Sequence, residues 1–157
     1  MADQQKITET FRAELKASPF IMLSVEGGRL SEPLTSQIDE DQPNALYFFV
    51  AKDNRAALGG PAMAHFASRG HDFFACLEGA VTQDNERAMI DKLWSKHVES
   101  WFPGGKDDPN LTLLRFEIAG AEMWGTDISL AGRVKLLFGG KIQPSEGSSH
   151  AVVDNIG

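Results

Sequence analysis

Residues 91–125 read DKLWSKHVESWFPGGKDDPNLTLLRFEIAGAEMWG, and this stretch decides the fold of the chain. In its first part, apolar residues recur at helical spacing as far as Trp101, whereas residues 111–117 alternate as in a strand. Residues 103–110 lie between them and are rich in Pro, Gly, Asp and Asn, which form turns and end helices. We therefore predict one helix that carries Trp94 and Trp101, then a stiff loop and a strand.

The segments before this stretch carry further helix and strand signals. Residues 3–18 predict an amphipathic helix ended by Pro19, because Ile7, Phe11 and Leu15 recur every four residues. Asp84 is predicted to cap the helix of the two tryptophans. Short strands are predicted at residues 20–25, 29–38, 45–51, 62–68 and 72–82, and a short helix at residues 131–138. Many short strands with few helices indicate an α+β protein built on an antiparallel barrel.

Length, composition and charge limit the class of protein. A chain of 157 residues, 42% hydrophobic and 24% charged, suits one globular domain. We expect this domain at residues 1–140 and an extended or mobile C-terminal tail at residues 141–157. No apolar run approaches the length of a membrane helix, and the formal net charge of −7 argues against nucleic acid or a membrane surface as partner. A single cysteine, Cys76, excludes an internal disulfide and favours the cytoplasm.

The sequence carries no conventional catalytic or metal-binding motif. The four histidines lack zinc-like spacing, and residues 104–106, GGK, lack the flanking residues of a phosphate-binding loop. Cys76 is interpreted as a small buried apolar residue rather than a nucleophile. We assign no catalytic residue and no metal ligand. This absence is compatible with an organic redox cofactor, which would carry the chemistry itself.

A run of specified positions points to a family. The pattern WFPxGKDDPxL at residues 101–111, followed by LLR at 113–115 and ExW at 122–124, closely resembles the general stress protein 26 family. That family belongs to the pyridoxamine 5'-phosphate oxidase-like group, the FMN-binding split barrels. The resemblance implies an antiparallel split β-barrel with flanking helices, a homodimer, and a flavin site at the subunit interface.

The resemblance also implies where FMN is held. The turn after the strand at residues 45–51 corresponds to the family's phosphate anchor, and Val50, Ala51, Lys52 and Arg55 occupy it. Lys52 and Arg55 can bind a dianion, although two basic residues on a surface turn are also common without a ligand.

The ring pocket is implied to lie near the tryptophans. Trp101 and Phe102 are expected to cover the flavin ring from the partner subunit, because aromatic faces stack on a flavin. Trp94 and Trp124 are interpreted as packing residues. The aromatic stripe around Trp94 and Trp101 would be exposed in a monomer, which independently predicts a dimer.

Four positions depart from the family's anchor pattern. Glu32 stands where relatives carry arginine, Val50 and Ala51 replace Thr-Ser, and Ala56 replaces lysine. A glutamate near a phosphate exchanges attraction for repulsion, worth a few kcal/mol at an effective dielectric constant of roughly 20. Two hypotheses therefore stay open.

The first hypothesis is an FMN-binding redox protein, reduced by a donor such as a nicotinamide. The second is a flavin-free dimeric binding or regulatory module that has lost the phosphate anchor. A split barrel for a deazaflavin or a haem is a third reading with no specific support in the sequence. Fold alone does not decide among them.

Overall fold

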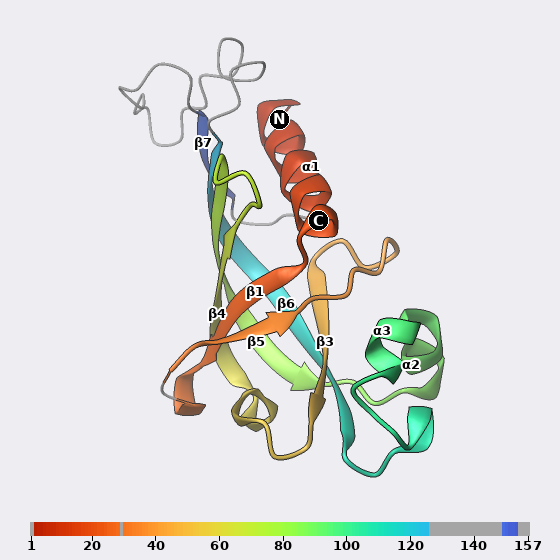
Figure 1. The fold of residues 1–157 in the computed structure, drawn as a ribbon. Helices are drawn as coiled ribbons and strands as arrows, with labels where there is room; N and C mark the ends of the chain where they lie inside the picture. The colour runs from red at the N-terminus through yellow and green to blue at the C-terminus, as the bar shows by residue number, and fades with distance from the viewer. Residues whose placement is uncertain (1, 29, 126–148, 154–157) are drawn as a thin grey trace.

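The computed structural model describes residues 2–28, 30–125 and 149–153 (Figure 1). Within these residues, seven antiparallel strands form one sheet in the order β2-β1-β4-β5-β6-β3, and β7 pairs with β6. The strands are β1 Phe20–Val25, β2 Glu32–Thr35, β3 Ala45–Ala51, β4 Gly60–Ala67, β5 Phe73–Gln83, β6 Leu111–Gly125 and β7 Ser149–Val153. The helices are α1 Ala2–Ala17, α2 Arg87–Leu93 and α3 Lys96–Glu99, with 3₁₀ turns η1 Glu26–Gly28, η2 Arg55–Leu58 and η3 Gly105–Asp107.

The sheet curls until its two edges nearly meet. Gln37, just after β2, forms an isolated antiparallel bridge with Tyr47 of β3. Two backbone hydrogen bonds, of 2.7 and 3.0 Å, join these residues. Because β2 and β3 are the outer strands of the six-strand path, this bridge turns the sheet into a nearly closed barrel.

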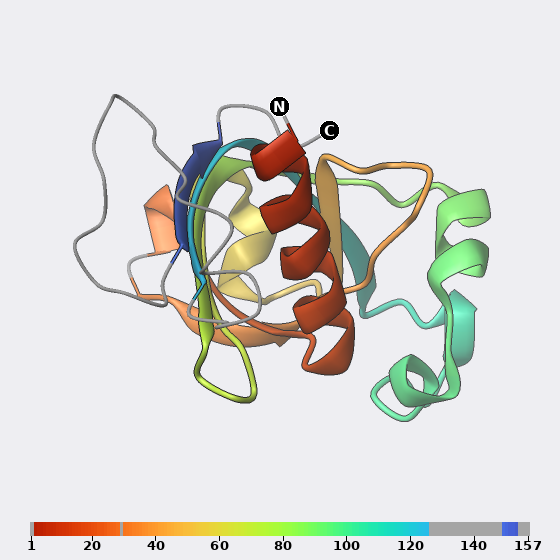
Figure 2. The ribbon, with the colours of Figure 1, turned by 90° about the horizontal axis from the view of Figure 1, so that it is seen from above.

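Helix α1 packs over one end of the barrel (Figures 1 and 2). Its buried side chains are those at the predicted four-residue spacing, Ile7, Phe11 and Leu15. The Phe11 ring meets Phe66 of β4 edge-on at 5.7 Å and stacks on Phe73 of β5 at 6.3 Å. The predicted amphipathic helix, which ends at Ala17 before Pro19, is confirmed.

Strand β3 is buried on both faces, which explains its unbroken apolar sequence ALYFFVA. Leu46, Phe48 and Val50 contribute to the barrel core beneath α1. Tyr47 and Phe49 contribute to a second core, which packs beneath α2 and α3. The predicted strands at residues 20–25, 45–51, 62–68 and 72–82 are all present, and the one predicted at residues 29–38 is the shorter β2. The two predicted hairpins, β1 with β2 and β4 with β5, are antiparallel.

The predicted single helix of the two tryptophans is wrong. The chain forms α2 and α3 instead, because Trp94 is extended (ψ 138°) and packs its ring edge-on against Phe49 at 5.7 Å. Ser95 then starts α3 by accepting a hydrogen bond from the Val98 amide at 3.2 Å. Trp101 lies beyond the end of α3. Glu86, not Asp84, is the residue before α2.

Asp84 instead continues the sheet. Its amide donates a hydrogen bond to the Leu113 carbonyl at 2.8 Å, which prolongs the pairing of β5 with β6. The pairing of β5 with β6 therefore reaches Asp84, the residue that was predicted to cap the helix.

The predicted tail at residues 141–157 is described only at Ser149–Val153. These residues form β7, paired with residues 121–125 of β6. The helix predicted at residues 131–138 lies outside the described residues. Among the described helices, none combines the length and the apolar character needed to cross a membrane.

A buried carboxylate ties the loop before β3 to α2. The Asp39 side chain is 1% exposed and accepts hydrogen bonds from Lys92 Nζ at 2.7 Å and from the Asp41 amide at 3.0 Å. Burial by itself raises the pKa of Asp39, but these hydrogen bonds and the charges of Lys92 and Arg115 outweigh it. The pKa of Asp39 therefore lies below its ordinary value.

This lowered pKa predicts a pH-dependent contribution to stability. The contribution is complete above the unfolded pKa of about 4 and is lost as pH falls through the lower folded pKa. Asp39→Asn should reduce the free energy of unfolding by about 2 kcal/mol at pH 7. Urea unfolding between pH 7 and pH 3 checks this expectation.

The difference between wild type and Asp39→Asn should shrink at the acid end of that range. Asp53→Asn, at an exposed loop carboxylate, is the control and should stay within about 0.5 kcal/mol of wild type. A difference for Asp39→Asn that stays constant across the range would contradict the assignment.

Candidate functional site

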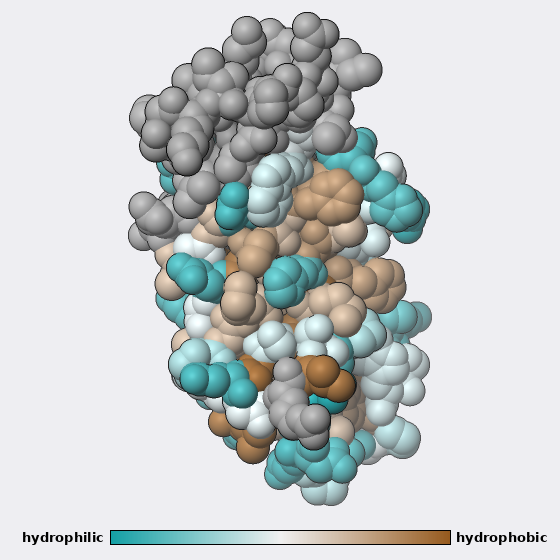
Figure 3. All heavy atoms as spheres, turned by 90° about the vertical axis from the view of Figure 1, so that its left-hand side faces the viewer, coloured by the Kyte–Doolittle hydropathy of each residue, from teal (hydrophilic) through white to brown (hydrophobic). Residues whose placement is uncertain are grey.

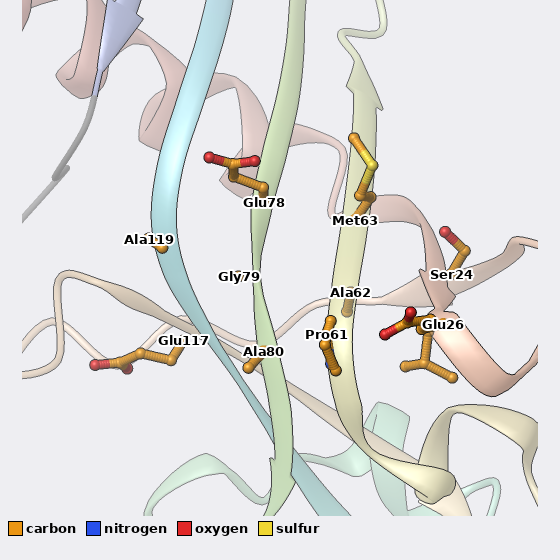
Figure 4. A pocket seen from close by; sticks show the side chains of 11 residues that line it. Ser24, Glu26, Pro61, Ala62, Met63, Glu78, Gly79, Ala80, Glu117 and Ala119 are labelled. Atoms are coloured by element: carbon orange, nitrogen blue, oxygen red, sulfur yellow. The ribbon is translucent and has the colours of Figure 1, made fainter.

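A groove of about 740 Å³ lies on the outer face of the sheet, over β1, β4, β5 and β6 (Figure 4). Small residues form its floor, among them Ala62, Gly79, Ala80 and Ala119. Gly79 sits at a shift of register in β5, and a Cβ built on it would lie 1.9 Å from the Glu117 carbonyl oxygen. The close approach of β5 to β6 therefore depends on the missing side chain.

Three carboxylates line the groove. Glu117 is paired with Arg115 at 2.7 Å, whereas Glu26 and Glu78 form no ion pair within the described residues. None of the described lining residues is basic. The groove thus offers small apolar contacts with an acidic border.

Exposed apolar side chains lie on the same outer face of the sheet as the groove. Met22 and Met63 point outward from β1 and β4, and Phe20 and Phe74 do so from β1 and β5. Figure 3, which looks at the side of the molecule drawn on the left in Figure 1, shows apolar side chains in the open among hydrophilic ones. Apolar surface of this kind is typical of a protein interface.

The aromatic stripe expected at Trp94 and Trp101 is only partly exposed. Trp94 is half-buried against Phe49, and Trp101 is 40% exposed with its ring 4.7 Å from His97. The outer face of β1, β4 and β5 is therefore the larger exposed apolar surface among the described residues.

The turn after β3 presents two of the four residues predicted for the phosphate anchor. Lys52 is exposed, and Arg55 opens η2, where the Asn54 side chain accepts a hydrogen bond from the Ala56 amide at 2.8 Å. The Val50 side chain lies in the barrel core, and Ala51 is half-buried. Of the four predicted anchor residues, Lys52 and Arg55 are therefore the two that can offer a charged side chain to a ligand.

A backbone contact joins this turn to the family-like loop. The Lys52 amide donates a hydrogen bond to the Asn110 carbonyl at 2.9 Å. The predicted anchor and the end of the segment at residues 101–111 therefore meet at one end of the barrel. Of the two aromatic residues in that segment, Trp101 is partly open, whereas Phe102 is buried with Ile90 and Val98 in the second core.

Arg55 is already paired with a carboxylate. Its Nε lies 3.5 Å from Oε2 of Glu32, which is the first residue of β2. The Glu32 side chain is 19% exposed, and its Oε1 is buried with no hydrogen-bond partner within residues 2–28, 30–125 and 149–153. A Cβ built on Gly28 would lie 3.6 Å from Arg55 Cβ, so the pair sits beside η1, whose first residue Glu26 lines the groove.

Cys76 is not fully buried, contrary to the prediction. It lies half-buried on the outer face of β5, opposite His65 on β4 and Glu122 on β6. Alternation already pointed there, since Ala75 and Leu77 face the core. Burial raises the pKa of the Cys76 thiol, and the charges of Glu122 and Glu78 raise it further. A higher pKa lowers the share of the nucleophilic thiolate, so the structure gives no support to Cys76 as a nucleophile.

Sequence reasoning missed the groove and the Glu32–Arg55 pair. The groove residues carry no motif, and their only signal is a run of small residues, Gly79-Ala80, within an otherwise regular strand. Glu32 was noticed only as a departure from a pattern. Its partner is 23 positions away, so only the closed barrel brings the two together.

The nearly closed antiparallel barrel with flanking helices is a split β-barrel, as predicted. The family described as pyridoxamine 5'-phosphate oxidase like matches residues 5–147, and the chain belongs to this family. The chain is also 41% identical over 46 residues to General stress protein 26 of Bacillus subtilis. That match covers 29% of this chain and 32% of the relative, so it spans about a third of that protein's length.

Two solved structures are similar over most of the chain. The general stress FMN/FAD binding protein of Xanthomonas citri is 36% identical, with a TM-score of 0.73, covering 85% of this chain and 99% of that one. A general stress family protein of Xanthomonas campestris pv. campestris is also 36% identical, with a TM-score of 0.75, covering 88% and 100%. The predicted general stress protein 26 resemblance is confirmed.

Proposed function

We propose that the protein binds a flavin, FMN or a relative of it, between the subunits of a homodimer and acts as a redox protein. The observation that carries this proposal is the Lys52–Asn110 backbone contact. It places the basic turn against the loop that bears the general stress protein pattern. The likeness to a Xanthomonas citri protein named for FMN and FAD binding supports the same proposal.

Two parts of the site would bind different ends of the flavin, the groove its ring and the turn after β3 its anionic end. The small residues Ala62, Gly79 and Ala80 leave room for a planar ring, and Lys52 attracts the anionic end of a ligand. Of the two aromatic residues expected to cover the ring, Trp101 is the one that remains exposed to a ring or to the partner subunit. When bound, the flavin itself accepts and delivers electrons, and a reduced nicotinamide is the proposed donor.

The fit to FMN differs between the two ends of the ligand. The groove has room for a ring and a polyol chain. Within the described residues, however, Lys52 is the one basic side chain of the anchor without an ion pair, because Arg55 is paired with Glu32. We therefore assign the ring end to the groove. The phosphate end is the part of FMN that these residues serve least well.

Fluorescence titration of the purified protein tests the proposal. Saturable quenching of flavin fluorescence is expected, and Lys52→Ala should weaken FMN binding about tenfold, the loss of one charge-assisted contact. Lys6→Ala, at an exposed position of α1, is the matched control and should leave FMN affinity unchanged. The proposal would be overturned if the protein did not quench the fluorescence of FMN, FAD or riboflavin.

A second function is favoured by one specific observation. The Glu32–Arg55 pair, together with Ala56, which is 2% exposed in the core, is what a barrel would retain after losing its phosphate anchor. We keep a flavin-free dimeric binding or regulatory module as the alternative. This alternative predicts a folded dimer that quenches the fluorescence of none of the three flavins in the titration.

A further inference from the structure

We infer that Glu32 acts as an internal counter-anion for Arg55, so that this site recognises a flavin without using its phosphate and binds riboflavin at least as tightly as FMN. The inference rests on the proposed flavin function and specifies the ligand class of that same site. Glu32 is thereby assigned as a residue that sets ligand specificity.

Glu32 competes with a ligand phosphate for Arg55. Glu32 Oε2 lies 3.5 Å from the guanidinium Nε, and Glu32 is the more buried of the two side chains. A phosphate that bound Arg55 would have to displace this carboxylate or share the guanidinium with it. Sharing would bring two anions together in a partly desolvated place, where their repulsion is poorly screened.

Within the described residues, the Glu32 carboxylate also has an unmet hydrogen-bond requirement. Glu32 Oε1 is buried and has no partner within the part of the chain that the structure describes. A buried carboxylate oxygen requires a donor, and an unmet requirement costs free energy. Riboflavin ends in a hydroxyl, which can donate to the Glu32 carboxylate, because this side chain is 19% exposed. The phosphate of FMN carries about two negative charges at neutral pH and presents chiefly acceptors, so it offers this carboxylate no donor.

The charge around the site also disfavours a phosphate. With Arg55 offset by Glu32, Lys52 is the remaining basic side chain of the turn. Glu26 and Glu78 line the neighbouring groove without an ion pair among the described residues. This surrounding field is negative and disfavours a dianion, whereas a neutral polyol end is unaffected.

The test compares two ligands that differ only in the phosphate. Full-length protein, freed of any flavin, is titrated separately with riboflavin and FMN at one ionic strength, and the ratio of Kd for FMN to Kd for riboflavin is recorded. The wild-type ratio is expected at 1 or above. In Glu32→Gln the ratio should fall at least tenfold, through tighter FMN binding with riboflavin affinity changed less than threefold. Circular dichroism confirms that the variant is folded.

Glu40→Gln is the matched control, because it removes the same charge from an exposed glutamate that pairs with Lys16 of α1. Its ratio should equal that of wild type. Wild-type protein that binds FMN much more tightly than riboflavin would overturn this inference while leaving the proposed function intact. A ratio unchanged by Glu32→Gln would also overturn it. Protein that binds neither flavin would overturn the proposed function and, with it, the inference.

Discussion

Replacing Gly79 with alanine is expected to lower the free energy of unfolding by about 3 kcal/mol, the upper part of the usual range for overpacking. The new Cβ would lie 1.9 Å from the Glu117 carbonyl oxygen and 2.9 Å from the Glu117 carbonyl carbon. Both are backbone atoms of β6, so no side-chain rotation relieves the clash. Strands β5 and β6 must move apart at the register shift that they share.

Urea unfolding at pH 7 and one fixed protein concentration measures this loss. Gly27→Ala is the matched control, because its new Cβ would meet only Leu58 Cδ1, at 3.7 Å, an ordinary contact. Its free energy of unfolding should stay within about 0.5 kcal/mol of wild type. Equal losses for the two substitutions would show that the close approach of β5 to β6 is not what Gly79 provides.

Periodicity predicted most of the fold because local pattern and burial agree in these segments. Ile7, Phe11 and Leu15 lie on one face of any helix, and that face is the one buried against β4 and β5. The sequence ALYFFVA favours a strand by composition and is then buried on both sides. In both segments, tertiary packing reinforces the local preference.

The break between α2 and α3 was not predictable from spacing. Leu93, Trp94 and Trp101 satisfy a helical period, but the contact of Trp94 with Phe49 of β3 draws Trp94 into an extended conformation. A local signal was nevertheless present. Ser95 is a good helix cap, and it marks the start of α3.

The candidate site was only partly predictable. Lys52 and Arg55 were found through the family's pattern, and the structure places both at the barrel end. The pairing of Arg55 with Glu32 depends on the position of η2 relative to β2, which neither segment encodes alone. The buried positions of Val50 and Ala56 likewise follow from the direction in which β3 and η2 face the core.

Met63→Glu is expected to raise the dissociation constant of the proposed homodimer at least about a hundredfold, or about 3 kcal/mol. Met63 is an exposed apolar residue that lines the groove, and its partner in the β-ladder is Glu78. A carboxylate at this position would face Glu78 directly and would lose its hydration if a second subunit covered the face. Like charge and desolvation therefore act in the same direction.

Analytical sedimentation at micromolar concentration measures the effect. Wild type should sediment as a dimer and Met63→Glu as a monomer with unchanged circular dichroism. Ala13→Glu adds the same charge on the exposed side of α1 and should leave the dimer intact. A monomeric wild type would exclude the homodimer. A Met63→Glu dimer of undiminished affinity would move the interface away from the outer face of β1, β4 and β5, and the partner's contribution to the flavin site would then have to come from another surface.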